Sequence, residues 1–372
     1  EREGKQSFAK AINSGVPDLS TAQALRLVLR ADIDGSGSVD TIFISQDSLL
    51  DHPASSQAIV FLEKEGKLNR SASWEKSLGE LGRVTSAICL DMDGDHDPDL
   101  LVSREAGSIG LFANQGDRFS DVSESVGLSE SVGLWQGLAV GDFDHDGRID
   151  FVAGNIGGNS PLEPYRDGLV YLSRAEEPRL AFVALREEDK LLPIDDMDLF
   201  SRVVARVALP ETYRAFSNVN LADVLKPFGA MKRKAITCLE SSVFFNRDGK
   251  FERIDLPPTA QLSPTSGASV ADFNNDGRAD LFLSQNWYSI RPDLGRLDSS
   301  AGLILLGQAD GKFEAVNSQQ SGLRVLGENL NAVVTDFNRD GRPDIVAPQT
   351  LGQAQFYLGQ AGKRGIRVSF GD

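Results

Sequence analysis

The chain has 372 residues, of which 41% are hydrophobic, and a formal net charge of −16 at pH 7. This hydrophobic content is enough for a folded core and excludes a disordered chain, and no apolar run reaches the ~18 residues of a membrane span. The negative charge argues against nucleic-acid binding and against anionic membrane surfaces, both of which require basic patches, so we expect no nucleic-acid partner and no membrane insertion.

An acidic stretch recurs five times along the chain. It reads ADIDGSGSVD at 31–40, LDMDGDHDPD at 90–99, GDFDHDGRID at 141–150, ADFNNDGRAD at 271–280 and TDFNRDGRPD at 335–344. Short runs rich in β-branched and aromatic residues flank most copies, which is typical of strands. Each copy is therefore predicted to be a loop that joins two strands. The third and fourth copies are about twice as far apart as the others, so we expect a unit without the loop between them.

A second motif, a glycine turn, follows four of the acidic stretches. It reads EKEGKL at 63–68, NQGDRF at 114–119, NRDGKF at 246–251 and QADGKF at 308–313, each between two apolar runs. Such turns predict β-hairpins. Four antiparallel strands in about 50–60 residues are typical of a propeller blade. The predicted fold is all-β, a single β-propeller of six or seven four-stranded blades over residues 1–372, which SFAKAINSGV at 7–16 would help to close.

The region between the third and fourth acidic stretches breaks this pattern. GLVYLSRAEEPRLAFVAL at 168–185 predicts a strand pair whose loop has lost its aspartates. Residues 186–235 have helical rather than alternating spacing, with Asn220 as an N-cap, and predict a small helical insertion. The two cysteines, Cys89 and Cys238, lie in apolar runs and read as small buried hydrophobes, with a single disulfide between them left open.

The aspartates within each acidic stretch have a shared spacing. Counting the first as position 1, side-chain oxygens fall at positions 1, 3, 5 and 9, and position 7 varies and would contribute its backbone carbonyl. Several hard oxygens around one point suit Ca²⁺, which takes 6–8 of them. The predicted ligands are Asp32, Asp34, Ser36, Ser38 and Asp40; Asp91, Asp93, Asp95, Asp97 and Asp99; Asp142, Asp144, Asp146, Arg148 and Asp150; Asp272, Asn274, Asp276, Arg278 and Asp280; Asp336, Asn338, Asp340, Arg342 and Asp344.

About five structural calcium ions are thus expected. The five loops contain 18 aspartates, which more than account for the net charge of −16. The alternative is that Asp and Gly simply form good turns. We expect the loop with Ser36 to be the weaker site, because Ser36 replaces an acid.

These stretches resemble the FG-GAP/VCBS repeats of integrin-α-type β-propellers, on the strength of DFDHDGRID, DFNNDGRAD and DFNRDGRPD. LFANQGDRFSDVSESVGL followed by GLAVGDFDHDG is similar to bacterial VCBS proteins that carry a C-terminal ASPIC/UnbV domain, and RGIRVSFGD at 364–372 is similar to the start of that domain. The resemblance implies a secreted, periplasmic or cell-surface protein with calcium-stabilised blades. It also implies binding rather than catalysis.

Two further stretches offer side chains for a partner. GNIGGNSPLEPYRDG at 154–168 contains Asn155 and Asn159, and QNWYSIRPDLGRLDSS at 285–300 contains Trp287, Tyr288 and Arg291. Trp, Tyr and Arg are typical of protein-binding hot spots and sugar-stacking surfaces. The alternative is a packed connection whose arginines pair locally.

The resulting prediction is a calcium-binding β-propeller that binds a protein or glycan partner and is not an enzyme. No histidine lies near a nucleophile motif. Two alternatives stay open: a polysaccharide lyase or hydrolase on the same scaffold, and a structural subunit of a larger surface assembly that docks through 186–235.

Overall fold

The computed structural model describes residues 25–46, 56–174, 181–194, 209–288, 296–350 and 352–360, with Met197 and Phe200. Strands dominate these residues, and the six sheets that they form are antiparallel throughout. The all-β prediction is therefore confirmed. Within the described part of the chain, no helix is long and apolar enough to cross a membrane.

Five of the sheets follow one another along the chain, and we number them 1 to 5. Sheet 1 contains β1 (Leu25–Ala31), β2 (Asp40–Gln46), β3 (Ser56–Lys64) and β4 (Lys67–Arg70), and α1 (Ala72–Leu78) follows it. Sheet 2 contains β5 (Val84–Leu90), β6 (Asp99–Ser108), β7 (Gly110–Asn114) and β8 (Phe119–Asp121), with β9 (Val132–Leu134) added to β6. Sheet 3 contains β10 (Leu138–Gly141), β11 (Asp150–Ala153), β16 (Ser242–Asn246) and β17 (Phe251–Asp255).

Sheets 4 and 5 complete the series. Sheet 4 contains β18 (Thr265–Ala271), β19 (Asp280–Gln285), β20 (Leu303–Gly307) and β21 (Phe313–Val316), and η3 (Pro258–Leu262) precedes it. Sheet 5 contains β22 (Val333–Thr335), β23 (Asp344–Ala347) and β24 (Gln355–Tyr357), and α5 (Ser318–Ser321) lies before it. The predicted strand pairs and hairpins are confirmed, because every acidic stretch joins the first two strands of a sheet and every glycine turn joins the third strand to the fourth.

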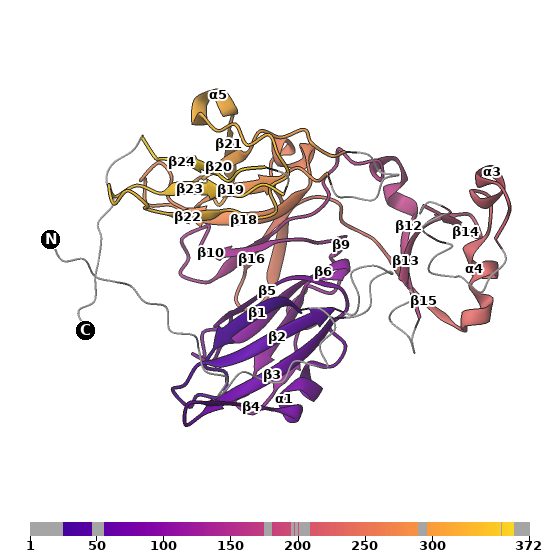
Figure 1. The fold of residues 1–372 in the computed structure, drawn as a ribbon, viewed down its shortest axis with the longest axis horizontal. Coiled ribbons are helices and arrows are strands. Elements are labelled where there is room, and N and C mark those ends of the chain that lie inside the picture. Colours follow the sequence, from indigo (N-terminus) through magenta and orange to yellow (C-terminus); the bar gives the residue numbers. More distant parts are fainter. Residues whose placement is uncertain are drawn as a thin grey trace.

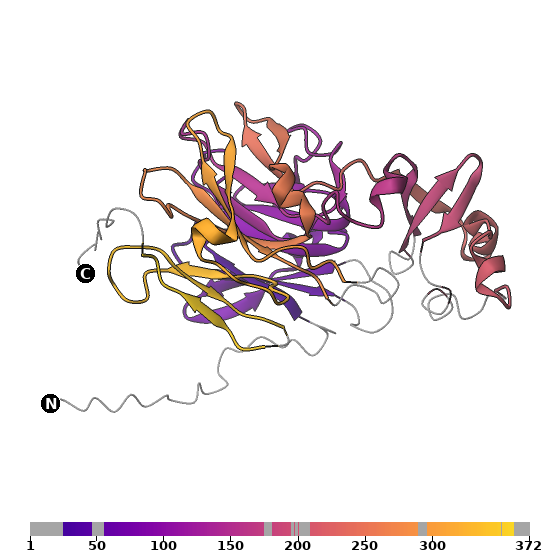
Figure 2. The ribbon, with the colours of Figure 1, turned by 90° about the horizontal axis from the view of Figure 1, so that it is seen from above.

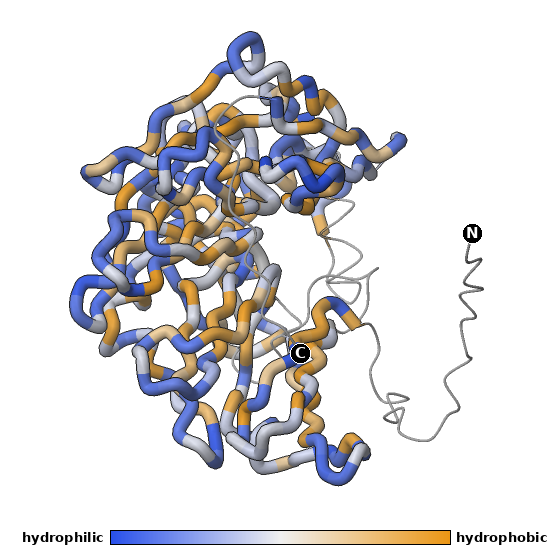
Figure 3. The backbone as a smooth tube through the Cα atoms, turned by 90° about the vertical axis from the view of Figure 1, so that its left-hand side faces the viewer, coloured by the Kyte–Doolittle hydropathy of each residue, from blue (hydrophilic) through white to orange (hydrophobic). Residues whose placement is uncertain are grey.

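Neighbouring sheets pack face to face in chain order. Separate apolar clusters fill the spaces between sheets 1 and 2, 2 and 3, 3 and 4, and 4 and 5. Strand alternation explains how one sheet serves two clusters: in β11, Phe151 packs toward sheet 2 while Val152 packs toward sheet 4. Figure 3 shows the apolar strand segments inside and hydrophilic loops at the edges. The first strands of consecutive sheets, β1, β5, β10, β18 and β22, lie side by side.

The sixth sheet is an insertion within sheet 3. Its strands are β12 (Leu169–Arg174), β13 (Ala181–Glu187), β14 (Lys190–Pro193) and β15 (Met231–Ala235), in the order β14-β13-β12-β15. The same insertion contains η1 (Glu163–Gly168), α3 (Tyr213–Phe216), α4 (Leu221–Val224) and η2 (Lys226–Phe228). Figures 1 and 2 show this inserted sheet, with α3 and α4, standing to the right of the other five.

The prediction of a helical insertion at 186–235 is wrong at both ends. Its first residues belong to β13 and β14 and its last residues form β15, while α3, α4 and η2, the helices described with their bounds between them, have one turn each. Asn220 does cap α4, with its side chain accepting a hydrogen bond from the Ala222 N–H. The strand pair predicted within 168–185 is present as β12 and β13, but it interrupts sheet 3 instead of following it, because β11 pairs with β16 beyond the insertion. Residues 7–16 and 364–372, which carried further predictions, lie outside the described residues.

Of the two cysteines predicted to be buried, Cys238 is buried and Cys89 is partly buried, and no disulfide joins them. Cys89 and Cys238 are free thiols in different apolar clusters, and burial raises the pKa of Cys89 to about 12. Trp135 is fully buried and packs against Phe244.

Candidate metal centres

The five acidic loops, residues 32–40, 91–99, 142–150, 272–280 and 336–344, share one backbone path. In each loop the residues at positions 4 and 6 have positive φ, at 55–85° and 76–90°. Glycine reaches such values without strain, and it occupies position 6 in every loop except the second, where His96 has a φ of 76°. The two left-handed residues turn the chain tightly enough to bring alternate side chains to one side.

The position 1 carboxylate closes each loop from within. Its two oxygens accept two N–H groups of the loop itself at 2.7–3.1 Å. In the third loop, for example, Asp142 accepts from Asp146 and Gly147. The turn thus holds its first ligand in place before any ion binds.

The position 9 aspartates are buried, and each ties its loop to a distant strand. Asp40, Asp99, Asp150, Asp280 and Asp344 are at most 1% exposed. In all five, Oδ2 accepts the N–H of position 2 of the same loop at 2.8–3.0 Å. Oδ1 accepts an N–H at 2.7–2.9 Å from Glu63, Asn114, Asn246, Gly307 or Gly359, at or just beyond the third strand of the same sheet. Each position 9 carboxylate therefore joins three parts of its sheet.

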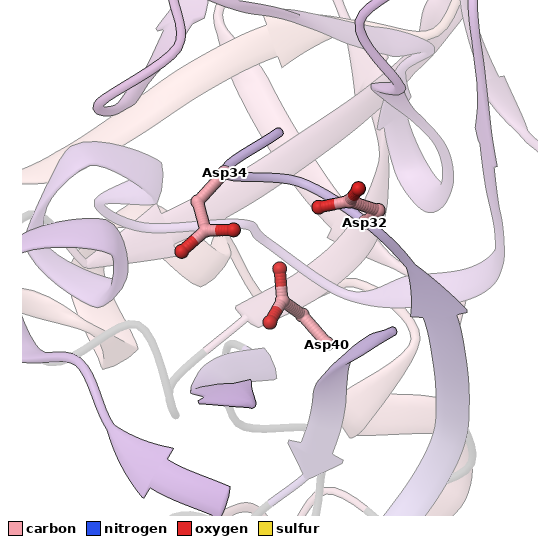
Figure 4. A group of neighbouring side chains, drawn as sticks. All are labelled: Asp32, Asp34 and Asp40. Carbon is pink, nitrogen blue, oxygen red and sulfur yellow. The ribbon is translucent and has the colours of Figure 1, made fainter. Parts of the chain in front are cut away.

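In the first three loops, carboxylates converge on a single point. Each of three aspartates offers one oxygen, and the three oxygens lie within 4.8 Å of one another, in the sets Asp32, Asp34 and Asp40; Asp91, Asp93 and Asp99; Asp142, Asp144 and Asp146. Figure 4 shows the first set pointing inward from the loop and from the start of β2. Ligands on opposite sides of a calcium ion are separated by roughly 4.6–5.2 Å, so this spacing fits one ion. The residues present therefore fit calcium.

The third loop also contains an unsatisfied buried oxygen. Asp144 Oδ1 has no hydrogen-bond partner within the described residues, although its Oδ2 bonds to Arg247 of the β16–β17 turn. Arg247 also approaches Asp146 at 3.6 Å and stacks on Phe245. A cation of the chain thus neutralises part of this loop, and one oxygen remains for an ion.

The fourth and fifth loops have an asparagine at position 3. The amide nitrogens of Asn274 and Asn338 donate to the position 5 aspartates at 3.2 and 3.1 Å. Arg278 and Arg342, at position 7, pair with the same aspartates at 2.7 and 3.0 Å. These two loops therefore have less uncompensated negative charge than the second loop. Position 7 was predicted to contribute only its backbone carbonyl, but in both loops the arginine side chain also contacts the loop.

The charge in the loops changes the acidity of their buried members. Burial, and then the neighbouring carboxylates, raise the pKa of Asp99 and of Asp150 to about 6, against the opposing effect of the N–H groups that they accept. The same causes raise the pKa of Asp40 and Asp280. A bound divalent cation would relieve this cost, because it favours the ionised form.

Sequence reasoning missed two residues that connect neighbouring loops. Asn114 ends β7 and donates its amide to the Ile33 carbonyl of the first loop at 2.9 Å. Asn246 ends β16 and donates in the same way to Met92 of the second loop at 3.3 Å. Both asparagines are the first residue of a glycine turn, in NQGDRF and NRDGKF. The asparagine at this position could have indicated a contact with the neighbouring loop, but the motif predicts only a hairpin when it is considered locally.

The stretch 154–168 does not present the predicted binding side chains together. Asn155 is fully buried, and its side chain bonds to the backbone of Leu134, Ile156 and Cys238. The prediction of a ligand-binding role for Asn155 is therefore wrong, because an interior position needs its amide to satisfy backbone groups. Asn159 is exposed and donates to the Leu262 carbonyl at 2.9 Å.

The stretch 285–300 is a packed connection where the structure describes it. Trp287 is partly buried in an apolar cluster, and its backbone bonds to Leu297. Tyr288 donates its hydroxyl to the Leu326 carbonyl at 2.5 Å, and Arg296 stacks over its ring at 5.1 Å. This arrangement matches the alternative of local pairing. Arg291 lies outside the described residues.

Comparison with known proteins supports the repeat assignment. Residues 91–153 match the FG-GAP-like repeat family model. Cartilage acidic protein 1 is similar to the chain in Xenopus tropicalis (38% identity over 204 residues) and Homo sapiens (26% over 200 residues), with 52% of this chain covered in both. The resemblance to FG-GAP repeats is confirmed. Each match spans 27% of the relative, so the chain corresponds to about a quarter of those proteins. Among solved structures, the Vibrio cholerae biofilm matrix protein Bap1 aligns at 15% identity with a TM-score of 0.31, over 85% of this chain and 42% of that one.

Proposed function

We propose that the chain is an extracellular interaction module, a β-propeller whose FG-GAP-type loops hold structural calcium. The observation that carries the proposal is the five-fold repetition of one loop geometry, in which a tight turn collects carboxylates and a buried aspartate ties the turn to a third strand. The FG-GAP-like match at 91–153 covers two of these loops and supports the same assignment.

The propeller assignment rests on how the five numbered sheets are stacked. Their first strands are neighbours in chain order, and every sheet between the ends packs apolar side chains on both faces. Radial stacking of four-stranded antiparallel sheets is the arrangement of blades in a propeller. At the two ends of the series, β1 and β22 each expose a valine, Val28 at 55% and Val333 at 58%, which suits a ring that continues beyond the described sheets.

Side-chain oxygens at positions 1, 3, 5 and 9, with the carbonyl of position 7, would hold the ion in each loop. When bound, calcium supplies positive charge to carboxylates that otherwise repel one another. The residues of the chain have two further roles. The position 1 carboxylate holds the turn by accepting N–H groups of the loop, and the position 9 carboxylate connects the loop to position 2 and to the third strand. Because the loop is assembled only in the folded state, binding free energy adds to folding stability.

The module would act by binding rather than by catalysis. Its two described histidines, His96 and His145, lie at turn positions of acidic loops and not beside a nucleophile. Structural calcium sites of this kind suit an environment rich in calcium, so we place the protein outside the cytoplasm, secreted, periplasmic or on a cell surface. The partner we propose is a protein or a glycan.

Calorimetric titration of chelated protein with calcium, combined with thermal unfolding in calcium and in chelator, tests this proposal. We expect four or five sites and a markedly lower melting temperature in chelator. Absence of bound calcium, together with unchanged unfolding, would mean that the aspartates only form turns.

A further inference from the structure

The inserted sheet and sheet 2 enclose a cleft whose charge is opposite to that of the chain. The cleft measures about 580 Å³. Sheet 2 and the segment before it contribute Arg83, Arg104 and Glu105, and the inserted sheet contributes Tyr171 and the run 232–234. Figure 1 shows the inserted sheet to the right of β6 and β9.

Basic residues outnumber acids in this cleft, although the chain as a whole carries 54 acidic and 38 basic residues. Five basic residues line it, namely Arg83, Arg104, Lys232, Arg233 and Lys234, and three acidic ones, Glu80, Glu105 and Asp121. Only Arg83 forms an ion pair, with Glu105 at 2.8 Å. Of the four other cations, none pairs with an acid within the part of the chain that the structure describes.

Arg104 is held in the wall of the cleft without a carboxylate partner. Its Nε donates to the Leu81 carbonyl at 2.6 Å and its Nη1 donates to the Ser108 carbonyl at 3.3 Å. The guanidinium lies 5.6 Å from the Phe112 ring centre and packs over Gly110, where a Cβ would lie 2.5 Å from Nη2. The charge of Asp121, in the same cleft, acts on this partly buried guanidinium, but the two form no ion pair within the described residues. An anion in the cleft could therefore contact the Arg104 guanidinium directly.

The lysines add to this positive charge. Lys232 and Lys234 are exposed on β15, an edge strand that pairs only with β12. Residues two apart on a strand point to the same side, roughly 6–7 Å from each other. Partial desolvation of the ammonium group beside the cleft, and next the nearby Arg104 guanidinium, lower the pKa of Lys234. Arg104 and Lys234 are therefore close enough to repel each other in the absence of an anion.

We propose that this cleft binds oxyanions, either free or as the carboxylate or sulfate groups of an acidic oligosaccharide. Arg104 would hold one anionic group at the wall, and Lys232 and Lys234 would contact further groups along β15. Ammonium and guanidinium groups bind such oxygens by charge-assisted hydrogen bonds. The inference does not depend on calcium in the acidic loops, since none of their residues lines the cleft.

Binding to the full chain, measured by calorimetry in calcium buffer, tests the proposal. The probes are sodium sulfate, tetragalacturonate and the uncharged tetrasaccharide cellotetraose. We expect the first or second probe to bind and cellotetraose not to bind. Binding of sulfate without binding of tetragalacturonate would identify a free anion as the ligand. Binding of tetragalacturonate alone, or with higher affinity than sulfate, would identify an acidic saccharide.

A matched pair of variants assigns the binding to the cleft. K232Q/K234Q removes two exposed lysines of the cleft, and K64Q/K67Q removes two exposed lysines of the β3–β4 turn, with the same change in net charge. We expect the first variant to lose about tenfold in affinity or more for each lysine, and the second to lose little. Because all four lysines are exposed, unchanged thermal unfolding will show that both variants fold. Equal losses in the two variants, or no binding of either anion, would overturn the proposal.

Discussion

The two ends of each acidic loop differ in burial and in role. At the exposed end, positions 1, 3 and 5 of the second and third loops are all aspartates, whose carboxylates repel one another. Asp93 is the clearest case, because partial desolvation, and then the charges of Asp95 and Asp91, raise its pKa. At the buried end, the position 9 carboxylate accepts two backbone N–H groups from separate parts of its sheet. The exposed end is suited to an ion, whereas the buried end already stabilises the sheet.

The difference shows that one motif combines two properties, the ability to bind an ion and the stabilisation of a sheet. A shared spacing of aspartates does not mean a shared energetic role, because a carboxylate that accepts backbone N–H groups stabilises the protein with or without metal. The second loop offers the cleanest comparison, since no arginine pairs with its aspartates within the described residues.

The largest effect is expected from Asp99→Ala, at the buried end. Loss of this carboxylate leaves the N–H groups of Met92 and Asn114 without acceptors inside the protein, at about 1–3 kcal/mol each. We expect the free energy of unfolding to fall by about 4 kcal/mol in chelator and by more in calcium, where Asp99 is also a proposed ligand, as measured by urea unfolding. Asp117→Ala, which removes an exposed aspartate from the β7–β8 turn of the same sheet, is the control. If Asp99→Ala lowered stability only in calcium, the carboxylate would act as a ligand alone, and its two backbone hydrogen bonds would contribute no stability.

A smaller and conditional effect is expected from Asp93→Ala, at the exposed end. In calcium the variant should lose about 2 kcal/mol of stability, because a weaker site contributes less binding free energy. In chelator it should lose little, because removing a charge that Asp95 and Asp91 repel offsets the loss of the exposed hydrogen bond from the Asp95 N–H. The same urea experiment checks both conditions. An equal loss of stability in calcium and in chelator would show that Asp93 has a structural role that does not depend on the ion, and the two ends of the loop would then not differ.

How far the sequence predicted this arrangement depends on the distance between interacting residues. The loops, the strand pairs around them and the glycine turns are local patterns, and they were predicted correctly. The contact between Asp99 and Asn114, or between Asp150 and Asn246, joins residues that only the folded sheet brings together. Likewise, the pairing of β11 with β16 across the insertion could not be read from local spacing, because strand partners are selected by tertiary packing. The burial of Asn155 was missed for the same reason.

The stability of the metal-free protein should depend on pH through the buried position 9 aspartates. The pKa values of Asp99 and Asp150 are about 6 in the folded state and ordinarily 3.8. The folded protein therefore binds these protons more tightly than the unfolded chain, so their stabilising contribution is fully present below pH 3.8 and is lost as the pH rises through about 6. In chelator, thermal unfolding should occur at a higher temperature at pH 5 than at pH 7. Asp99→Asn with Asp150→Asn should weaken this trend, leaving the part due to Asp40 and Asp280, whose pKa values are also raised. A trend of unchanged size would place its origin elsewhere.

The smallest effect on the free energy of unfolding is expected from His96→Gly, in the turn between the two ends of the second loop. His96 occupies position 6 of the second loop with a φ of 76°, where the other four loops have glycine at 82–90°. A side chain in this region of φ costs about 1–2 kcal/mol, part of which the greater freedom of unfolded glycine offsets. His96→Gly should therefore raise the free energy of unfolding by about 0.5–1 kcal/mol in chelator, without changing the number of calcium sites. His145→Gly, at position 4 of the third loop with a φ of 62° near the left-handed helical minimum, should gain less. Destabilisation by His96→Gly would show that the imidazole, 3.6 Å from Asp91, stabilises the exposed end more than its backbone strain costs.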